Sequence, residues 1–208
     1  MTIAATTPSL LRTRTAVAMS FALNGLLFAT LVSRLPDVRA DLSLSNSELG
    51  LLLISGSVGS VLSLPLSGRI IERFKPAATV RGGSVAVGVG LLVMALGATV
   101  LEKPLLASFG LFVYGIGTSV WDVAMNVEGA EVERRLGRTI MPRFHAAWSV
   151  GSIVGSGVGV LMAALSVPVI AHDLLIAVVC VALTIRSAGT FLAVEEKHES
   201  ERPRVSAW

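Results

Sequence analysis

Six long apolar stretches limit what this chain can fold into. Each is close to the roughly 20 residues that cross a hydrocarbon core about 30 Å thick. They cover residues 16–33, 49–67, 82–101, 105–121, 146–166 and 169–185. Their apolar residues are continuous rather than alternating, which is typical of helices and not of the strands of a membrane β-barrel. The sequence therefore predicts an all-α membrane protein with six transmembrane helices.

Composition excludes several classes of protein. Only 15% of the residues are charged, against roughly 25% in a soluble domain. The single cysteine, Cys180, cannot form a disulfide or a multi-cysteine metal site within one chain. No Gly-x-x-x-x-Gly-Lys-Ser loop occurs, which disfavours ATP hydrolysis. No spacing fixes a serine such as Ser156 beside a histidine, which disfavours a hydrolase. We expect no enzyme, no catalytic residue, no metal and no cofactor.

The positive charges predict the direction of the chain through the membrane. Of the 17 Lys and Arg residues, all but Arg34, Arg39 and Lys103 fall on one side of the predicted spans. Positively charged loops stay cytoplasmic, so both termini are expected inside the cell, in a multi-pass protein of the inner membrane. The net charge of +3 is thus a topology signal and does not indicate nucleic acid. The expected organisation is a cytoplasmic segment 1–15, a bundle 16–193 and a cytoplasmic linker 194–208.

Polar residues at the span ends have structural interpretations. Ser45 and Glu48 have the spacing of a capping box that opens the second span. The sixth span is placed at 169–185 so that Arg186 reaches the cytoplasmic interface. No chemistry is assigned to the polar residues expected in the external turns, which are His172, Asp173, Asp37, Asp41 and Glu48.

The loop between the second and third spans carries a family signature. Residues 68–76 read Gly-Arg-Ile-Ile-Glu-Arg-Phe-Lys-Pro. This segment resembles the major facilitator superfamily loop Gly-x-x-x-Asp-Arg-x-Gly-Arg-Arg, with Glu72 in place of Asp and Arg73 retained, while Lys75 and Pro76 depart from it. The resemblance implies a conformational gate formed by Gly68, Glu72 and Arg73. The alternative is that these charges only set the topology.

Other segments are similar to a sugar-permease-like bacterial branch of the same superfamily. They are residues 21–25, 34–38, 121–129 and 142–149. Members of this superfamily have twelve spans in two six-span bundles, so the resemblance implies that this chain is the first bundle, built as a 3+3 inverted repeat. A faint echo between residues 55–60 and 151–156 is compatible with such a repeat.

Four polar residues in or near the spans are candidates for solute binding or proton coupling. Asn24 lies midway along the first span and should face the bundle interior. Asp122 and Asn126 share one helix face near the cytoplasmic end of the fourth span, and His145 opens the fifth. Asp122 or His145 could take up a proton there. The alternatives are a helix-to-helix hydrogen bond for Asn24 and an interface cluster of caps and ion pairs with Arg143 for the others.

Aromatic and glycine residues complete the set of candidates. Trp121 and Trp148 are expected at headgroup depth, with stacking on a sugar ring as the alternative. Gly151, Gly155 and Gly159 form one stripe of the fifth span and should allow close helix packing. Ser156 stands where a related antiporter motif has proline, and the Arg-x-x-Gln-Gly pattern of proton antiport is missing from the fourth span.

The preferred function is a secondary transporter, or half of one, that moves a small polar solute by alternating access. We interpret the solute as a sugar or related compound, and H+ as the coupling ion. One bundle supplies only one wall of the cavity, so the expected partners are a second six-helix bundle or a second copy of this chain, besides the lipid bilayer. The other hypothesis is a non-transporting remnant or scaffold whose polar residues hold the helices together.

Overall fold

The computed structural model describes residues 7–192, in which every regular element is a helix. The α-helices are α1 (Thr7–Asp41), α2 (Asn46–Thr99), α3 (Pro104–Leu136), α4 (Met141–Ala164) and α5 (Val169–Ser187), followed by the 3-10 helix η1 (Ala188–Thr190). All five α-helices are long and apolar enough to cross a membrane. The prediction of an all-α membrane protein is therefore confirmed.

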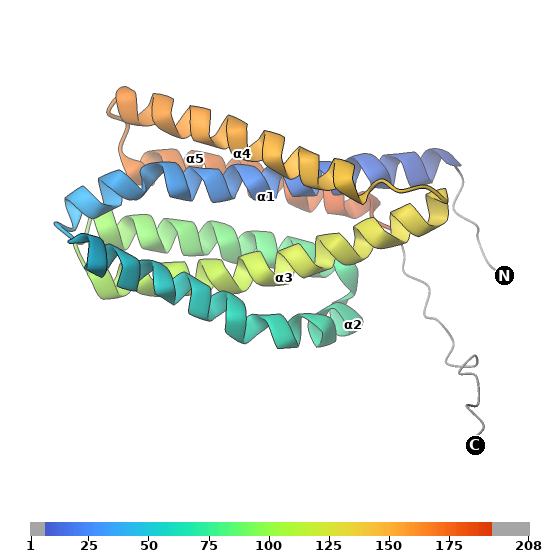
Figure 1. Cartoon of the computed structure of the whole chain (residues 1–208), viewed down its shortest axis with the longest axis horizontal. Helices are drawn as coiled ribbons and strands as arrows, with labels where there is room; N and C mark the ends of the chain where they lie inside the picture. Colours follow the sequence, from blue (N-terminus) through green and yellow to red (C-terminus); the bar gives the residue numbers. More distant parts are fainter. Residues whose placement is uncertain (1–6, 193–208) are drawn as a thin grey trace, which may run out of the picture.

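The expected count of six separate helices is not met, because α2 continues through the predicted loop between the second and third spans. Its one non-helical residue is Lys75, with φ 67° and ψ 157°. The ring of Pro76 disfavours helical backbone at the residue before it, which accounts for the break at this position. The chain folds back there, so that α2 consists of two arms, 46–74 and 76–99 (Figure 1).

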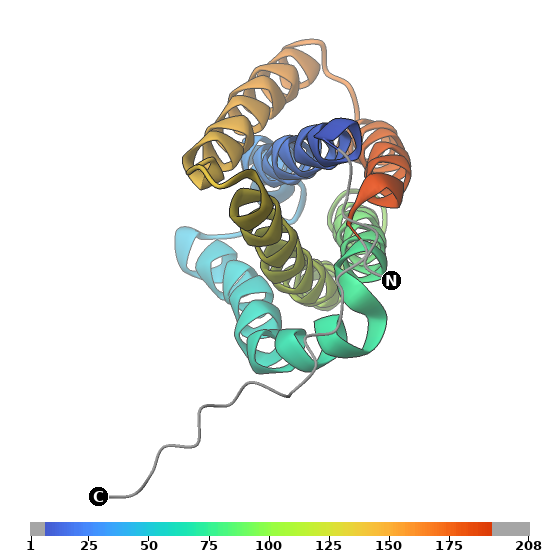
Figure 2. The same ribbon diagram turned by 90° about the vertical axis from the view of Figure 1, so that its right-hand side faces the viewer.

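The helices form one bundle of roughly parallel and antiparallel rods. α1 packs between α4 and α5, while α3 packs against both arms of α2 (Figure 2). α1 starts and α5 ends at the same end of the bundle, on the right in Figure 1. The bend of α2 and the connection from α3 to α4 lie at this end as well. We call it the basic end, because Arg12, Arg73, Arg138 and Arg186 belong to these segments.

Several helices extend beyond the apolar stretches that predict them. α1 continues to Asp41 and α3 to Leu136, well past the predicted ends at residues 33 and 121. Their charged end turns need no apolar surroundings, so hydropathy does not detect them. The start of α2, in contrast, was predicted from a short sequence motif. The predicted capping box is confirmed, since Ser45 N–H donates to Glu48 Oε2 at 2.8 Å and Glu48 N–H donates to Ser45 Oγ at 3.2 Å.

Two helix pairs approach closely at glycines. A Cβ atom at Gly151 of α4 would collide with the carbonyl oxygen of Ala22 on α1, and one at Gly155 would lie 2.6 Å from the carbonyl oxygen of Leu26. Gly159 lies against Ser33 further along the same line. The predicted glycine stripe thus faces α1 in the structure. In the second pair, Gly59 of α2 lies against the carbonyl oxygen of Phe112 on α3.

Serine hydroxyls join the same two pairs of helices. Ser152 Oγ of α4 donates to the carbonyl oxygen of Gly25 on α1 at 3.2 Å. Ser60 Oγ of α2 donates to the carbonyl oxygen of Gly115 on α3 at 2.9 Å. In both pairs a Gly-Ser dipeptide, 151–152 or 59–60, packs on a glycine of its neighbour. In each contact, the serine that follows a glycine donates to the carbonyl oxygen of a glycine on the neighbouring helix.

A buried group of charged residues lies at the other end of the bundle. Arg34 of α1 is 3% exposed. Its guanidinium donates from Nη2 to the carbonyl oxygen of Val167 at 2.7 Å and pairs through Nε with Asp37 Oδ2 at 2.7 Å. His172 and Asp173 of α5 are buried, with Nδ1 and Oδ1 3.8 Å apart, and both interact electrostatically with Arg34.

This arrangement corrects the interpretation of these residues as parts of external turns. Asp37 is helical within α1, and His172 and Asp173 lie in the first turn of α5, where they point into the bundle. The apolar stretch predicted the start of α5 correctly at Val169. The apolar stretch could not predict that the polar residues His172 and Asp173, near the start of α5, face Arg34 of α1.

Candidate functional site

Asn24 lies in the middle of α1 and joins it to α4. Its side chain is 6% exposed, and Oδ1 accepts a hydrogen bond from Trp148 Nε1 at 2.9 Å. The indole of Trp148 also lies beside Phe28, with ring centroids 5.5 Å apart. Burial on an apolar helix makes an unpaired amide costly, and the indole N–H satisfies one of its two functional ends. The amide N–H groups of Asn24 remain available to a further partner.

Asp122 of α3 and His145 of α4 lie nearer to the basic end. Both side chains are exposed, and they are close enough for the imidazole and the carboxylate to interact electrostatically. The His145 ring packs edge-on against Phe21 of α1, with centroids 5.2 Å apart. The structure thus brings together the acidic and imidazole groups that sequence spacing placed on separate helices.

Asn126 is half-buried one turn beyond Asp122 on α3. Its Nδ2 donates to the backbone carbonyl of Asp122 at 2.9 Å, a bond within the same helix. This bond holds the amide against the helix surface beside the carboxylate. We refer to Asn24, Asp122, Asn126, His145 and Trp148 together as the polar cluster.

Trp121 is buried inside the bundle, which contradicts its expected role as a membrane anchor. Its side chain is 0% exposed, and Nε1 donates to Ser20 Oγ of α1 at 2.8 Å. The indole therefore packs between α3 and α1 inside the bundle. Stacking on a sugar would also require an exposed ring face. This burial could not be predicted from the sequence alone, because an indole at a span end suits an interface as well as a core.

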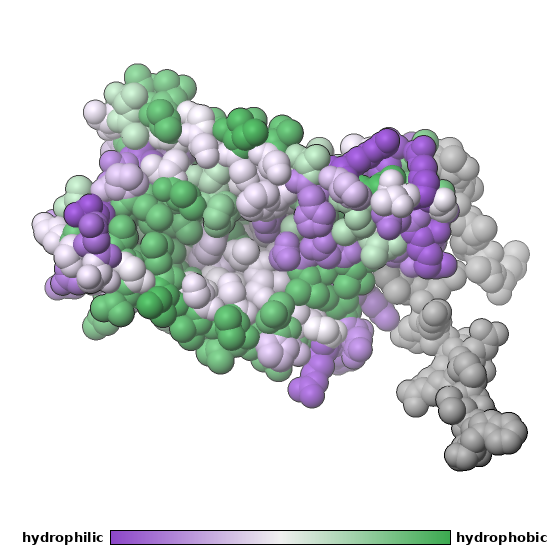
Figure 3. Space-filling model, in the orientation of Figure 1, coloured by the Kyte–Doolittle hydropathy of each residue, from purple (hydrophilic) through white to green (hydrophobic). Residues whose placement is uncertain are grey.

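The surface formed by α4, α3 and the first arm of α2 is not uniformly apolar. In Figure 3 a pale band of weakly hydrophobic and polar residues crosses this face between green apolar areas and the purple basic end. Asp122 of α3 and His145 of α4, two of the helices that form this face, are both exposed. A surface that meets only lipid tails would carry no such groups without partners. This face is therefore suited to contact water or protein.

The residues of the loop signature lie at the bend of α2. Gly68 has no atom of another residue within reach of a Cβ, so close helix contact does not require glycine at this position. Glu72 and Arg73 are both exposed on the last turn of the first arm. Across residues 7–192 neither of them takes part in an ion pair. A lock that uses these charges would need a partner outside the described bundle.

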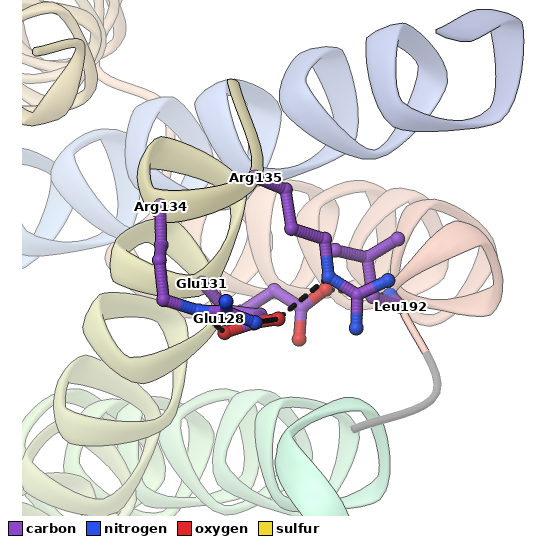
Figure 4. Close-up of polar contacts among 5 residues, drawn as sticks. All are labelled: Glu128, Glu131, Arg134, Arg135 and Leu192. Carbon is purple, nitrogen blue, oxygen red and sulfur yellow. Dashed lines mark hydrogen bonds and ion pairs between the residues drawn. The ribbon is translucent and has the colours of Figure 1, made fainter. Parts of the chain in front are cut away.

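A second group of charges was not predicted as a site. Figure 4 shows Glu128, Glu131, Arg134 and Arg135 on the last turns of α3. Glu131 pairs with both arginines, at 2.5 Å to Arg134 Nη2 and 2.6 Å to Arg135 Nε. Glu128 is buried, and its Oε1 accepts a hydrogen bond from the backbone N–H of Leu192, which follows η1. This contact joins the end of α3 to the end of the described chain.

Removal of the Glu128 carboxylate should loosen this junction. We expect Glu128→Ala to lower the free energy of unfolding by about 1–3 kcal/mol, because the Leu192 N–H loses its acceptor. Glu128→Gln keeps a carbonyl oxygen and should cost less. Thermal unfolding in a mild detergent would compare the two variants, with Glu72→Gln as the control for loss of a carboxylate, because Glu72 is exposed and takes part in no ion pair within residues 7–192. Equal destabilisation by the Ala and Gln variants would contradict the role of the Leu192 hydrogen bond.

Comparison with known proteins gives the family. The family model of the Major Facilitator Superfamily matches residues 17–207. The chain is 35% identical over 162 residues to the uncharacterized transporter y4wD of Sinorhizobium fredii, covering 78% of this chain and 42% of the relative. It is 33% identical over 141 residues to an uncharacterized MFS-type transporter of Yersinia pestis, covering 67% and 35%. Membrane protein MosC of Rhizobium meliloti is 29% identical over 154 residues, covering 72% and 36%.

The chain spans between 35% and 42% of the length of these relatives. The family match itself covers almost the whole chain, including every α-helix that the structure describes apart from the first turns of α1. It is a family of transporters and not of enzymes, which agrees with the apolar helices. On this match, the chain belongs to the Major Facilitator Superfamily.

Proposed function

We propose that this chain forms the first bundle of a secondary transporter in the inner membrane, with both termini cytoplasmic. The distribution of Lys and Arg supports this orientation, since they gather at the end where α1 starts and α5 ends. The solute is a small polar compound such as a sugar, carried by alternating access. In such a transporter the solute binds near the midplane between two bundles that rock against each other.

In this proposal the two arms of α2 cross the membrane separately, which makes six crossings in a 3+3 inverted repeat. The fold-back at Lys75 supports this division. The matching contacts of the two helix pairs support the repeat, because Ser152 on Gly25 and Ser60 on Gly115 join helices that would be equivalent in the two triplets. The contacts make residues 59–60 equivalent to 151–152, which differs by about one helical turn from the sequence alignment of residues 55–60 with 151–156.

The second bundle would pack on the face formed by α4, α3 and the first arm of α2. The pale band in Figure 3 supports this placement, since it interrupts the apolar surface that lipid tails prefer. Asp122 and His145 belong to this face, and among residues 7–192 neither of them takes part in an ion pair. Either a longer chain or a second copy would supply the other wall of the cavity.

The observation that carries the proposal is the exposed Asp122 within electrostatic reach of His145, about one helical turn along α4 from the Trp148 that binds the buried amide of Asn24. A carboxylate and an imidazole can hold or release a proton between them, and an amide can hydrogen-bond a hydroxyl group of the solute. In this mechanism Asp122 and His145 couple H+ to movement of the solute. Asn24 and Trp148 contact the solute, and Asn126 supports Asp122 from the next turn.

A non-transporting role is the second candidate, and the helix-to-helix hydrogen bonds favour it. Trp148 to Asn24 and Trp121 to Ser20 both join α1 to a neighbour within the bundle. If these bonds are the only function of the polar residues, substitution would change stability and nothing else. The two candidates therefore differ in whether a solute changes the behaviour of the protein.

Solute-dependent stabilisation tests the proposal on the full-length native gene product. We expect one member of a panel of neutral monosaccharides, including D-glucose and D-galactose, to raise the unfolding temperature of the purified protein. A ligand at 100 times its Kd stabilises the folded state by about 2.7 kcal/mol. Asn24→Ala should abolish the shift, and Asp122→Asn should remove any dependence of the shift on pH.

Asp41→Asn is the matched control, since Asp41 is an exposed carboxylate at the end of α1 away from the polar cluster. It should keep both the shift and its pH dependence. The non-transporting candidate would be supported if Asn24→Ala lowers stability while no sugar of the panel changes the unfolding temperature of the native protein or of any variant. A response that survives Asn24→Ala and Asp122→Asn unchanged would overturn the assignment of these residues.

A further inference from the structure

An apolar groove runs between α1 and α5 on the side of the bundle away from the polar cluster. Its volume is about 580 Å3. Leu11, Thr15 and Met19 line it from one face of α1, and Leu183 lines it from α5. Leu11, Met19 and Leu183 are each about two fifths exposed. Figure 2 shows α1 between α4 and α5, so the groove along α5 and the contact with α4 lie on different sides of α1.

Two arginines line the same groove at one end. Arg12 lies in the second turn of α1, and Arg186 lies in the last turn of α5. Both are exposed, and within residues 7–192 neither has an ion-pair partner. Because α1 starts and α5 ends at the basic end, both guanidinium groups lie there. Met19 lies seven residues further along α1, roughly 10 Å deeper at 1.5 Å per residue.

We propose that this groove binds an anionic phospholipid, with its phosphate between Arg12 and Arg186 and the upper part of one acyl chain along Leu11, Thr15, Met19 and Leu183. The inference rests on the proposed membrane orientation, which puts the arginines at the cytoplasmic headgroup level. Basic pockets between transmembrane helices on this side bind phosphate-bearing headgroups. An arginine also binds a phosphate through parallel N–H donors.

The shape and the charges both favour a lipid over a free anion. A free phosphate would need only the two guanidinium groups, whereas the groove also has an apolar lining that includes Leu11, Met19 and Leu183. In a membrane, an open apolar groove of this kind is covered by acyl chains. Occupation would hold the end of α5 against the start of α1, where Thr13 Oγ1 already donates to the carbonyl oxygen of Thr190 at 2.6 Å.

Retention of lipid in native mass spectrometry tests the site on the full chain in mild detergent. The probes are phosphatidylglycerol and phosphatidylcholine, added separately at equal concentration. We expect wild type to retain one phosphatidylglycerol preferentially. Arg12→Gln with Arg186→Gln should weaken this preference roughly tenfold or more. Thr15→Phe, which fills the groove without changing charge, should also weaken it.

Matched controls separate the groove from general electrostatics. Arg14→Gln with Arg138→Gln removes the same charge at the basic end from residues that do not line the groove, and it should retain the preference. An equal loss in this control would overturn the proposal, as would full retention in the Arg12/Arg186 variant. Displacement of the lipid by inorganic phosphate alone, or unchanged binding in Thr15→Phe, would mean that the arginines bind a free anion and would also overturn it.

Two further outcomes have separate meanings. The first outcome concerns the variant in which Glu195, Glu196, Glu199 and Glu201 are replaced by Gln. If this variant shows the lipid preference and wild type does not, acidic residues of this chain pair with the two arginines, and the lipid assignment is overturned. Lipid retention requires neither transport nor a solute, so its failure leaves the proposed function intact. Failure of the solute response with lipid retention intact would overturn the proposed function alone.

Discussion

Substitution of Gly151 by alanine is expected to disrupt the contact between α1 and α4. The new methyl group would collide with the carbonyl oxygen of Ala22, which is backbone and cannot rotate away. The two helices would have to separate along a contact that also contains Gly155 and the hydrogen bond from Ser152 to Gly25. Overpacking of a well-packed interior costs about 1–3 kcal/mol, and occasionally more. We expect the upper part of this range, seen as a lower free energy of unfolding in detergent.

Gly157 supplies the matched control on the same helix. No atom lies within 4 Å of a Cβ built at this position. Gly157→Ala should therefore raise the free energy of unfolding by roughly 0.5–1 kcal/mol, because alanine favours a helix over glycine. The two Gly→Ala changes thus have opposite expected signs. A neutral Gly151→Ala variant, or equal effects at both positions, would contradict the close approach of α4 to α1.

The apolar spans could be predicted from the sequence because the membrane imposes one length on every crossing. α5 begins at Val169 as expected, and its last residue lies within two positions of the predicted end. It was harder to predict that α2 folds back at a single non-helical residue. Gly68 to Pro76 looked like a loop, yet all of it except Lys75 is helical. Charged residues form helix as readily as apolar ones, so hydropathy alone cannot locate a helix end.

The polar cluster could be predicted only in part. Spacing placed Asp122 and Asn126 on one helix face, and the structure gives them a common surface with His145. The pairing of Asn24 with Trp148 depends on how α1 and α4 are rotated against each other, which helix periodicity does not fix. The same limit explains Trp121, whose burial follows from Ser20 on α1 and not from its own neighbours in sequence.

The buried charged residues at the end of the bundle opposite the basic end were missed for a related reason. His172 and Asp173 follow Pro168 closely, and polar residues after a proline usually belong to an exposed turn. Here α5 starts immediately at Val169, so both side chains enter the bundle in its first turn. Arg34 reaches them from α1, although 138 positions separate it from His172 in the numbering. A single sequence carries no signal for such a distant pairing.

Arg34 is expected to contribute more to stability than any other charged side chain of α1. Arg34→Leu would remove the donor to Val167 and the partner of Asp37, and would leave Asp173 buried without the nearby positive charge. Loss of a hydrogen bond from a charged group costs about 1.5–3 kcal/mol, and a buried acceptor left without its donor adds to this loss. We expect a loss of this size in the free energy of unfolding, measured by titration with sodium dodecyl sulfate in mixed micelles.

The double variant distinguishes a charge effect from a loss of packing. If the uncompensated Asp173 carboxylate causes most of the loss, Arg34→Leu with Asp173→Asn should recover a large part of it, since both charges are then removed together. Arg39→Leu is the control, because Arg39 is exposed on the same helix and donates only to the carbonyl oxygen of Leu44. It should change stability by no more than about 1 kcal/mol. Additive losses in the double variant would mean that Arg34 stabilises α1 against α5 through the hydrogen bond to Val167 and its packing, and that its charge has little effect on Asp173.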